Sequence, residues 1–254
     1  MKVTVLGSGT SQGVPVIACT CEVCESSDLR DKRTRASILV ECKGQTIVID
    51  TGPDFRTQML RERVMNLDAV LFTHEHKDHI AGLDDIRAYN FKSGGKAMDV
   101  FASEQVQEAL HREFPYVFTK NKYPGVPEIN LKTIAKELLE IGEMRIIPID
   151  VVHYKMPVKA FRIENFAYVT DANFISKDEK ENLKGLDVLI LNALRKSKHI
   201  SHYSLEEAIA LVEELQPKKA YFTHISHLMG KHADFDSILQ DNISFAYDGL
   251  QIEI

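Results

Sequence analysis

Short apolar runs rich in β-branched residues alternate with turn signals along the chain, and this pattern predicts strands. The first run is Met1–Leu6, and the glycine turn Gly7-Ser8-Gly9-Thr10 ends it. Two further runs, Ala36–Cys42 and Thr46–Asp50, flank the turn at Lys43-Gly44. Because a two-residue glycine turn between alternating runs is typical of a β-hairpin, we expect these two strands to pair.

Four other apolar runs end at a residue that can bind a metal. They are Asp68–Thr73 before His74, Arg145–Val152 before His153, Ala167–Thr170 before Asp171, and Ala220–Thr223 before His224. Side chains at strand ends sit on rigid elements, so we expect the four residues to share one rim of the fold.

Helical patterns are fewer. Ser204 and Glu207 form a capping box, apolar residues follow at helical spacing, and Pro217 lies just beyond the expected end. Weaker signals predict a helix after Ser176 and another over Ser103–Phe114.

Two segments give no clear pattern. Leu131–Ile141 has helical propensity, but its neighbours resemble strands. Asn90–Pro127 contains most of the helix- and strand-breaking Gly and Pro residues, and we expect it to be an irregular excursion. Strands dominate both halves, with helices after them. We therefore expect an αββα sandwich, an α/β (layered α+β) fold of two mixed β-sheets flanked by helices, in a single domain over residues 1–254.

Composition and charge narrow the class of protein. The chain has 254 residues, 44% of them hydrophobic and 27% charged, and its net charge is −6. This balance argues against a general nucleic-acid binder. No apolar run approaches the roughly 18 residues that a membrane helix needs. With no signal-peptide pattern, we expect a cytoplasmic protein without a membrane partner.

The densest chemical signal is the run His74-Glu75-His76-Lys77-Asp78-His79. His74 and His76 lie two apart, so they share one face of an extended chain, while Asp78 and His79 follow in a turn. Such nitrogen and oxygen donors suit zinc and related divalent cations. Lone histidines such as His111 are more often surface residues, but this density favours a metal centre. The strand-end residues His153, Asp171 and His224 are its natural completion, with Asp171 as a bridging carboxylate.

Thr73–His79 has the pattern T-H-x-H-x-D-H, and with the spaced later ligands it resembles the metallo-β-lactamase superfamily over nearly the whole chain. The resemblance implies an αββα fold and a hydrolase with two divalent metal ions, zinc or manganese. The implied ligands are His74, His76 and His153 for the first ion, Asp78, His79 and His224 for the second, and Asp171 between them.

A second cluster of metal-capable residues is the cysteine loop. Cys19, Cys21 and Cys24 are too close for a disulfide framework and well spaced for a metal, and His227 is a candidate fourth ligand. The alternative is three buried or free cysteines. This combination resembles the PhnP-type phosphodiesterases, which hydrolyse cyclic phosphates. The resemblance implies a structural zinc at these four residues, and the segments Gly7–Pro15, Thr223–His227 and Tyr247–Leu250 agree with it.

The implied activity is hydrolysis of a small phosphodiester, with a cyclic one as the leading expectation. A metal-bridging hydroxide would attack phosphorus. Asp78 and His202 are the expected catalytic residues, and the resemblance gives His202 the role of general acid. Arg87 and Arg195 are candidate phosphate-binding residues by chemical type, whereas Arg35 is expected to form a surface salt bridge.

Three other functions stay open. A tRNA 3′-processing endonuclease, with RNA as partner, is disfavoured because no long glycine-proline arm is present. A thioester or lactone hydrolase could use the same centre, since metals also polarise carbonyl groups. A non-catalytic metal-binding protein is the least favoured. Gly82–Arg87 and the Asn90–Pro127 segment differ from the phosphonate-pathway enzyme, which leaves the substrate open. The family resemblance suggests a homodimer.

Overall fold

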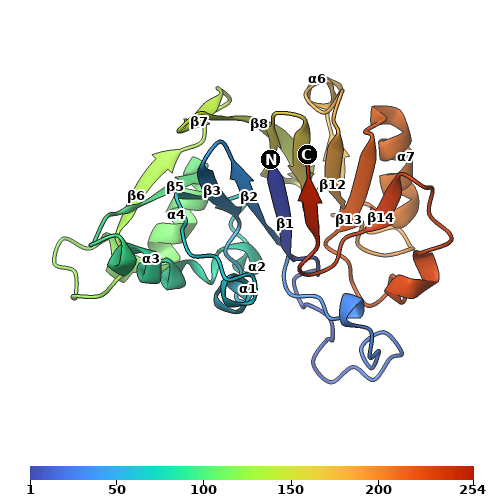
Figure 1. Cartoon of the computed structure of the whole chain (residues 1–254), viewed down its shortest axis with the longest axis horizontal. Coiled ribbons are helices and arrows are strands. Elements are labelled where there is room, and N and C mark those ends of the chain that lie inside the picture. The colour runs from blue at the N-terminus through green and yellow to red at the C-terminus, as the bar shows by residue number, and fades with distance from the viewer.

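The computed structural model describes all residues from 1 to 254. Two mixed β-sheets lie face to face, with helices on their outer sides (Figure 1). The first sheet has, in spatial order, β15 (Gln251–Glu253), β1 (Lys2–Gly7), β2 (Ser37–Cys42), β3 (Gln45–Ile49), β4 (Ala69–Leu71), β5 (Met98–Ala102) and β6 (Ile129–Thr133).

The second sheet follows the order β11 (Phe174–Ile175), β8 (Met144–His153), β9 (Met156–Ile163), β10 (Phe166–Val169), β12 (Val188–Asn192), β13 (Lys219–Thr223) and β14 (Ile243–Phe245), with β7 (Leu139–Ile141) paired to β8. Strands β3 to β6 are parallel, and so are β10, β12, β13 and β14. Parallel strands bring their carboxyl ends to one edge of a sheet, and this edge forms the candidate site.

The helices cover the outer faces. Beside the first sheet lie α1 (Phe55–Arg61), α2 (Lys77–Ile80), α3 (Arg87–Lys92), α4 (Glu104–Glu113) and α5 (Pro115–Phe118), and beside the second lie α6 (Lys177–Glu181) and α7 (Leu205–Leu215). Short 3-10 turns occur at η1 (Leu29–Asp31), η2 (Leu83–Ile86) and η3 (His232–Phe235). The αββα prediction is confirmed.

Three apolar clusters hold these layers together. One lies between the sheets and includes Ile38, Ile47, Phe161 and Tyr168. The other two pack the outer face of each sheet against its helices. This layering follows from strands that are apolar on both faces, because each face must be covered.

Several local predictions are also confirmed. The hairpin pairs Cys42 with Gln45, and Lys43 and Gly44 both have positive φ, as a two-residue turn of this kind requires. The capping box at Ser204 begins α7, and Ser103 caps α4. No helix in the chain combines the length and the apolar character needed to cross a bilayer.

Two segments differ from expectation. Leu131–Ile141 contributes to two strands, β6 and β7, because pairing with β5 and β8 outweighs its helical propensity. The Asn90–Pro127 segment is not an irregular excursion, since it contains β5, α4 and α5. Strand β5 is short, and its burial between β4 and β6 is a long-range effect that local periodicity does not reveal.

Candidate metal centres

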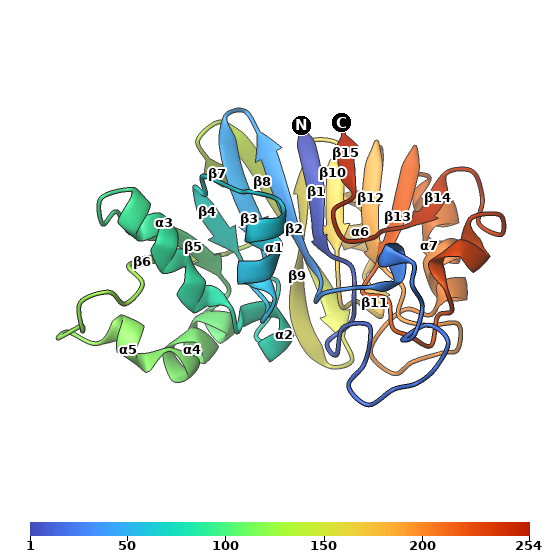
Figure 2. The same cartoon turned by 60° about the horizontal axis from the view of Figure 1, so that its bottom comes forward.

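Four strands of the two sheets deliver metal-capable side chains to one edge, at the bottom of the molecule in Figure 2. His74 follows β4, His153 is the last residue of β8, Asp171 follows β10, and His224 comes directly after β13. The rim predicted from the strand ends is therefore present in the structure.

Asp171 lies between the histidines of the two sheets. Its Oδ2 atom is 3.2 Å from Nε2 of His79, and its Oδ1 atom is 3.1 Å from Nε2 of His224. A carboxylate with one oxygen towards each of two imidazoles has the arrangement that a bridging ligand needs. Asp78 Oδ2 is also 3.2 Å from Nε2 of His79.

The predicted ligands form one continuous cluster. The tightest groups have all donor atoms within 4.8 Å of one another: His74, His79 and Asp171; Asp78, His79 and His224; His153, Asp171 and His202. The ring of His76 lies 4.7 Å from that of His74 and 5.2 Å from that of His153, centroid to centroid. All seven predicted ligands are thus neighbours, and their division between two ions stays a prediction.

The donor atoms of this cluster fit divalent cations. Nε2 of His74, Nε2 of His79 and both ring nitrogens of His224 are buried without a hydrogen-bond partner. A buried unpaired polar atom is unfavourable by about 1–3 kcal/mol, so several in one place call for a common partner. Imidazole nitrogens and carboxylate oxygens are the ligands that zinc, manganese and related ions accept.

Asp50 is a functional residue that the sequence did not reveal. Its Oδ2 atom accepts hydrogen bonds from Nδ1 of His79 at 2.7 Å and from the Thr73 hydroxyl at 2.8 Å. Because that hydroxyl gives its only proton to Asp50, it accepts from Nδ1 of His74 at 2.9 Å. Both histidines therefore turn Nε2 towards the centre. The only signal in the sequence is an acidic residue at the end of an apolar strand.

The backbone around the centre adopts unusual conformations. Asp50, Tyr154, Asp171 and His224 all have φ between 55° and 67°. Non-glycine residues are rare in this left-handed region, and such strain concentrates at functional sites. The side-chain amide of Asn192 holds the turn after Asp171, since it bonds both N–H and C=O of Ala172.

Burial and neighbouring charges set the protonation of the centre. Burial lowers the pKa of His74 well below its usual value. Burial alone would raise the pKa of Asp171, but His224 and His79 outweigh it and hold the pKa well below its usual value. Burial opposes the charge of His79, yet Asp171 and Asp50 raise its pKa well above the usual value. A metal cation would take the place of that proton and meet the same carboxylates.

His202 lies at the cluster, as the family resemblance implied. Its ring centroid is 4.5 Å from that of His153 and 4.7 Å from that of His224. Its Nδ1 atom is 3.7 Å from Oδ1 of Asp171. Burial and the neighbouring His224 lower the pKa of His202 to about 3, which favours the neutral imidazole.

The two arginines predicted to bind phosphate have other partners. Arg87 pairs with Asp84 at 3.1 Å. Arg195 donates to the carbonyls of Ser197 and Lys198, within the loop that leads to His202. Neither forms a hydrogen bond or an ion pair with the cluster. Arg35 pairs with Asp54 at 3.2 Å, which confirms the expected salt bridge.

The cysteine loop forms a second cluster. The sulfur atoms of Cys19, Cys21 and Cys24 lie 3.3, 3.4 and 3.6 Å from Nδ1 of His227. No disulfide is present, and the four donor atoms converge as a tetrahedral zinc site would require. The backbone N–H of Cys24 lowers the pKa of the Cys21 thiol to about 6, whereas burial raises that of Cys24 to about 11.

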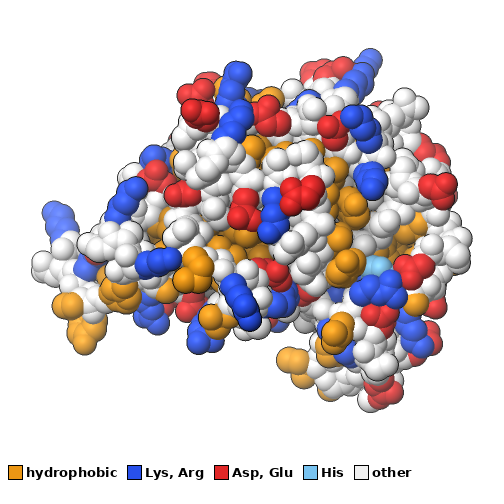
Figure 3. Space-filling model, viewed as in Figure 1, with side chains coloured by type: hydrophobic (Ala, Val, Ile, Leu, Met, Phe, Trp, Pro, Cys, Tyr) orange, Lys and Arg blue, Asp and Glu red, His pale blue; other side chains and the backbone are white.

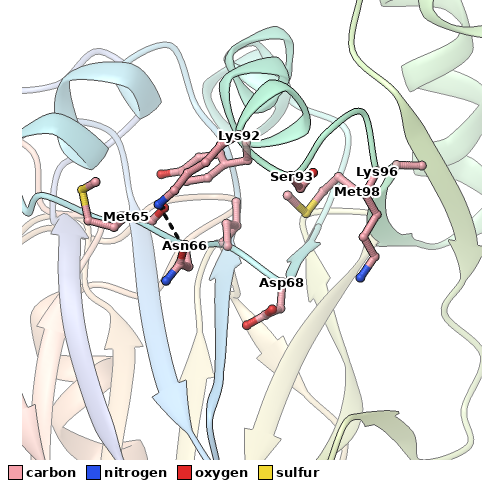
Figure 4. Close-up of a pocket in the computed structure, with 10 residues that line it drawn as sticks. Met65, Asn66, Asp68, Lys92, Ser93, Lys96 and Met98 are labelled. Atoms are coloured by element: carbon pink, nitrogen blue, oxygen red, sulfur yellow. Dashed lines mark hydrogen bonds between the residues drawn. The ribbon is translucent and has the colours of Figure 1, made fainter.

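Two hollows on the surface lie away from these clusters. One cavity of about 260 Å³ is lined by Met65, Asn66, Asp68 and Lys92, and Lys92 donates to Asn66 there (Figure 4). A neighbouring groove runs between α1 and α3, on a face where apolar side chains gather (Figure 3). Neither hollow contains a residue of the two clusters.

Comparison with known proteins places the chain in a family. Residues 45–225 match the model of the beta-lactamase superfamily domain. The crystal structure of a diphosphatase from the PhnP family is 40% identical, with a TM-score of 0.93 over 99% of this chain and 96% of that one. Zinc-bound PqqB from Methylobacterium extorquens is 20% identical, with a TM-score of 0.79 over the full length of both chains, and supports the fold.

An octanoyltransferase from Porphyromonas gingivalis is 37% identical over 99% of this chain. The chain spans only 51% of that protein, so the activity in its name belongs to a protein about twice as long. The chain belongs to the metallo-β-lactamase superfamily and, within it, to the PhnP family. Its histidine–aspartate site is that of a metal-dependent hydrolase of this fold.

Proposed function

We propose that the chain is a two-metal phosphodiesterase that hydrolyses a small, preferentially cyclic, phosphodiester. The observation that carries this proposal is the position of Asp171, with one oxygen beside His79 and the other beside His224. Two metal ions held there would activate water near neutral pH and neutralise the non-bridging phosphoryl oxygens. Their proposed ligands are His74, His76, Asp78, His79, His153, Asp171 and His224.

The protein residues around the centre have separate tasks in this proposal. Asp50 and Thr73 orient the imidazoles of His79 and His74 through the bonds described above. All four side chains are buried, so water does not compete for these hydrogen bonds. His202 gives a proton to the departing oxygen, a role suited to a side chain that lies beside His153 and His224.

The role of His202 has a sharp test. His202→Ala should lower kcat by about 10²- to 10⁴-fold on an alkyl-leaving phosphodiester. A nitrophenyl diester has a leaving group that needs no proton, so its turnover should fall far less. Retention of both metals in the variant would be checked by elemental analysis. Equal losses on the two substrates would contradict the acid role.

A second candidate is hydrolysis of a phosphoanhydride. The observation that favours it is the 40% identical relative described as a diphosphatase. The same centre could serve, because both reactions displace oxygen from a phosphorus atom that carries two ester or anhydride groups. Thioester hydrolysis has weaker support, which comes from the octanoyltransferase of which this chain matches half.

A substrate panel separates these candidates. The purified chain, with zinc or manganese added, would be given a 2′,3′-cyclic nucleotide, a linear dinucleotide, a dinucleoside diphosphate, an octanoyl thioester and a tRNA precursor. We expect the highest kcat/KM for the cyclic diester and none without metal. A higher kcat/KM for the dinucleoside diphosphate or the thioester would replace the proposed substrate class with that one.

A further inference from the structure

The conformation of His224 requires support from its neighbours. This buried histidine has a φ of 57°, and neither ring nitrogen has a hydrogen-bond partner. A left-handed non-glycine residue is unfavourable by about 1–3 kcal/mol unless the surroundings hold it. Nε2 of the side chain lies 3.1 Å from Asp171, and this contact does not fix φ, so the restraint on φ comes from the backbone on either side.

That restraint comes from the first glycine turn of the chain. Ile225 donates its N–H to the carbonyl of Ser8 at 2.9 Å, and its carbonyl accepts from the N–H of Thr10 at 3.2 Å. Gly9 and Ile225 thus form an isolated parallel bridge. On the other side of His224, the carbonyl of Thr223 accepts from the N–H of Ala193 at 2.9 Å. The Gly7–Thr10 segment is therefore one of two supports for His224.

Ser8 is fixed in turn by two buried charges. Asp248 accepts from both the N–H and the hydroxyl of Ser8 at 2.9 Å. The same hydroxyl accepts from Nη1 of Arg33 at 2.9 Å, and Arg33 is only 3% exposed. Because a hydrogen bond to a charged partner is stronger than a neutral one, these two contacts fix the position of Ser8 firmly.

The glycines of this segment are explained by the same packing. A Cβ atom on Gly7 would lie 1.9 Å from the carbonyl oxygen of Arg35, and one on Gly9 would lie 2.8 Å from that of Arg33. The segment can approach the backbone of residues 33–35 only without side chains at these two positions. The glycine turn thus serves to bring the Ser8 carbonyl within reach of Ile225.

We propose that Ser8, fixed by Arg33 and Asp248, is a positioning residue that holds His224 in its metal-binding conformation. This inference rests on the proposed role of His224 as a ligand of the second ion. It gives the opening glycine turn a function in assembling the centre, although the turn contributes no ligand of its own.

Cobalt binding to the metal-free chain tests this role. Cobalt bound by thiolates gives a near-ultraviolet band, which reads the cysteine cluster. The histidine–aspartate centre is read from the visible bands of a chain whose cysteine cluster already holds zinc. Ser8→Ala should weaken the second cobalt at the histidine–aspartate centre by about 10-fold or more, the range for outer partners of metal ligands. The thiolate band should be unchanged. Asp248→Asn keeps an acceptor oxygen for Ser8 and should weaken cobalt less.

The matched control is Thr34→Val. Thr34 donates its hydroxyl to the other oxygen of Asp248 at 2.6 Å, so its loss disturbs the same carboxylate without removing a bond of Ser8. We expect the melting temperature of this control to fall by about as much as that of Ser8→Ala. Its cobalt affinity should equal that of the parent chain. Parental affinity in Ser8→Ala, or equal weakening in both variants, would overturn the positioning role. Absence of visible-band cobalt binding in the parent chain would instead refute the proposed two-metal function.

Discussion

The histidine–aspartate centre and the cysteine–histidine cluster gather their donor atoms from different parts of the fold. The centre takes its residues from the ends of β4, β8, β10 and β13, in both sheets, and from α2, which contains Asp78 and His79. The cluster takes three of its four residues from one loop between β1 and η1, in which no helix or strand occurs. That loop has only a small apolar core of Val14, Val23 and Cys24.

In the centre the fold positions the metal ligands, whereas in the cysteine–histidine cluster a metal ion would stabilise the fold of the loop. The sheets and buried partners such as Asp50 and Asn192 position the residues of the centre. The cysteine loop has few apolar contacts, so an ion at the cluster would contribute directly to its folding. Loss of the centre should therefore remove activity and leave stability nearly unchanged. Loss of the cluster should lower stability and leave catalysis per folded molecule nearly unchanged. The predictions below test this contrast.

The largest effect is expected from Asp171→Ala. Without the carboxylate between His79 and His224, the centre should no longer hold two ions. Turnover should fall by more than about 100-fold, beyond the range for loss of an outer partner. Elemental analysis should show that the cysteine cluster keeps its metal. Asp178→Ala on the exposed face of α6 is the control, and two tightly bound centre metals in Asp171→Ala would refute the bridging role.

Cys21→Ser should have the opposite result. The free energy of unfolding should fall by about 4 kcal/mol or more, the range typical of a lost metal site. Catalysis per folded molecule should stay close to the parental value. Denaturant unfolding and active-site titration measure the two quantities, with Cys42→Ser as the control because Cys42 lies in β2, apart from the cluster. Unchanged stability with unchanged zinc content would exclude a structural site.

Asp50→Asn should lower metal affinity at the histidine–aspartate centre by a smaller amount and should not affect the cysteine cluster. The amide keeps the shape of Asp50 but weakens its bond to Nδ1 of His79, which orients that imidazole. We expect metal affinity at the centre to fall by about 10- to 100-fold. Competition with a chelating dye measures it. Asp54→Asn, which disturbs the bonds of Asp54 to the guanidinium and the backbone N–H of Arg35, should leave it unchanged.

The smallest effect concerns pH and the contact between Arg33 and His232. Burial and the nearby Arg33 lower the pKa of His232 from 6.5 to about 4. Between these values the unfolded chain binds a proton at this residue and the folded chain does not. The stability is therefore complete above pH 6.5 and falls by about 1–3 kcal/mol as the pH drops towards 4.

His232→Asn isolates this contribution, since an amide oxygen can still accept from Arg33 and does not titrate. Thermal melts of both proteins over this pH range should show a smaller loss in the variant. Parallel curves would mean that His232 does not cause the acid sensitivity.

The local part of the site could be predicted from the sequence, and the long-range part could not. The run from His74 to His79 is contiguous, so its density alone marks a metal motif. His153, Asp171 and His224 were found because each follows an apolar strand. Asp50 also ends an apolar strand, but the sequence does not name its partner, because only the folded chain brings Asp50 to His79 across 29 positions.

The same limit applies to the fold. The hairpin at Lys43-Gly44 and the capping box at Ser204 are encoded within a few residues, and both predictions are confirmed. Strands β5 and β6 depend on parallel neighbours far away in the chain, and these were missed or left open. Gly9 and Ile225 are even farther apart in the sequence, and no pattern in either segment predicts that they pair.

The most direct test of the account is metal titration of catalysis. The chain would be stripped of metal, its cysteine cluster refilled, and further zinc or manganese added stepwise while turnover of a cyclic phosphodiester is recorded. We predict that turnover appears only as the histidine–aspartate centre fills and reaches its limit at two ions in that centre. Full turnover in the metal-stripped chain, or no phosphodiester turnover with two ions bound, would contradict the account.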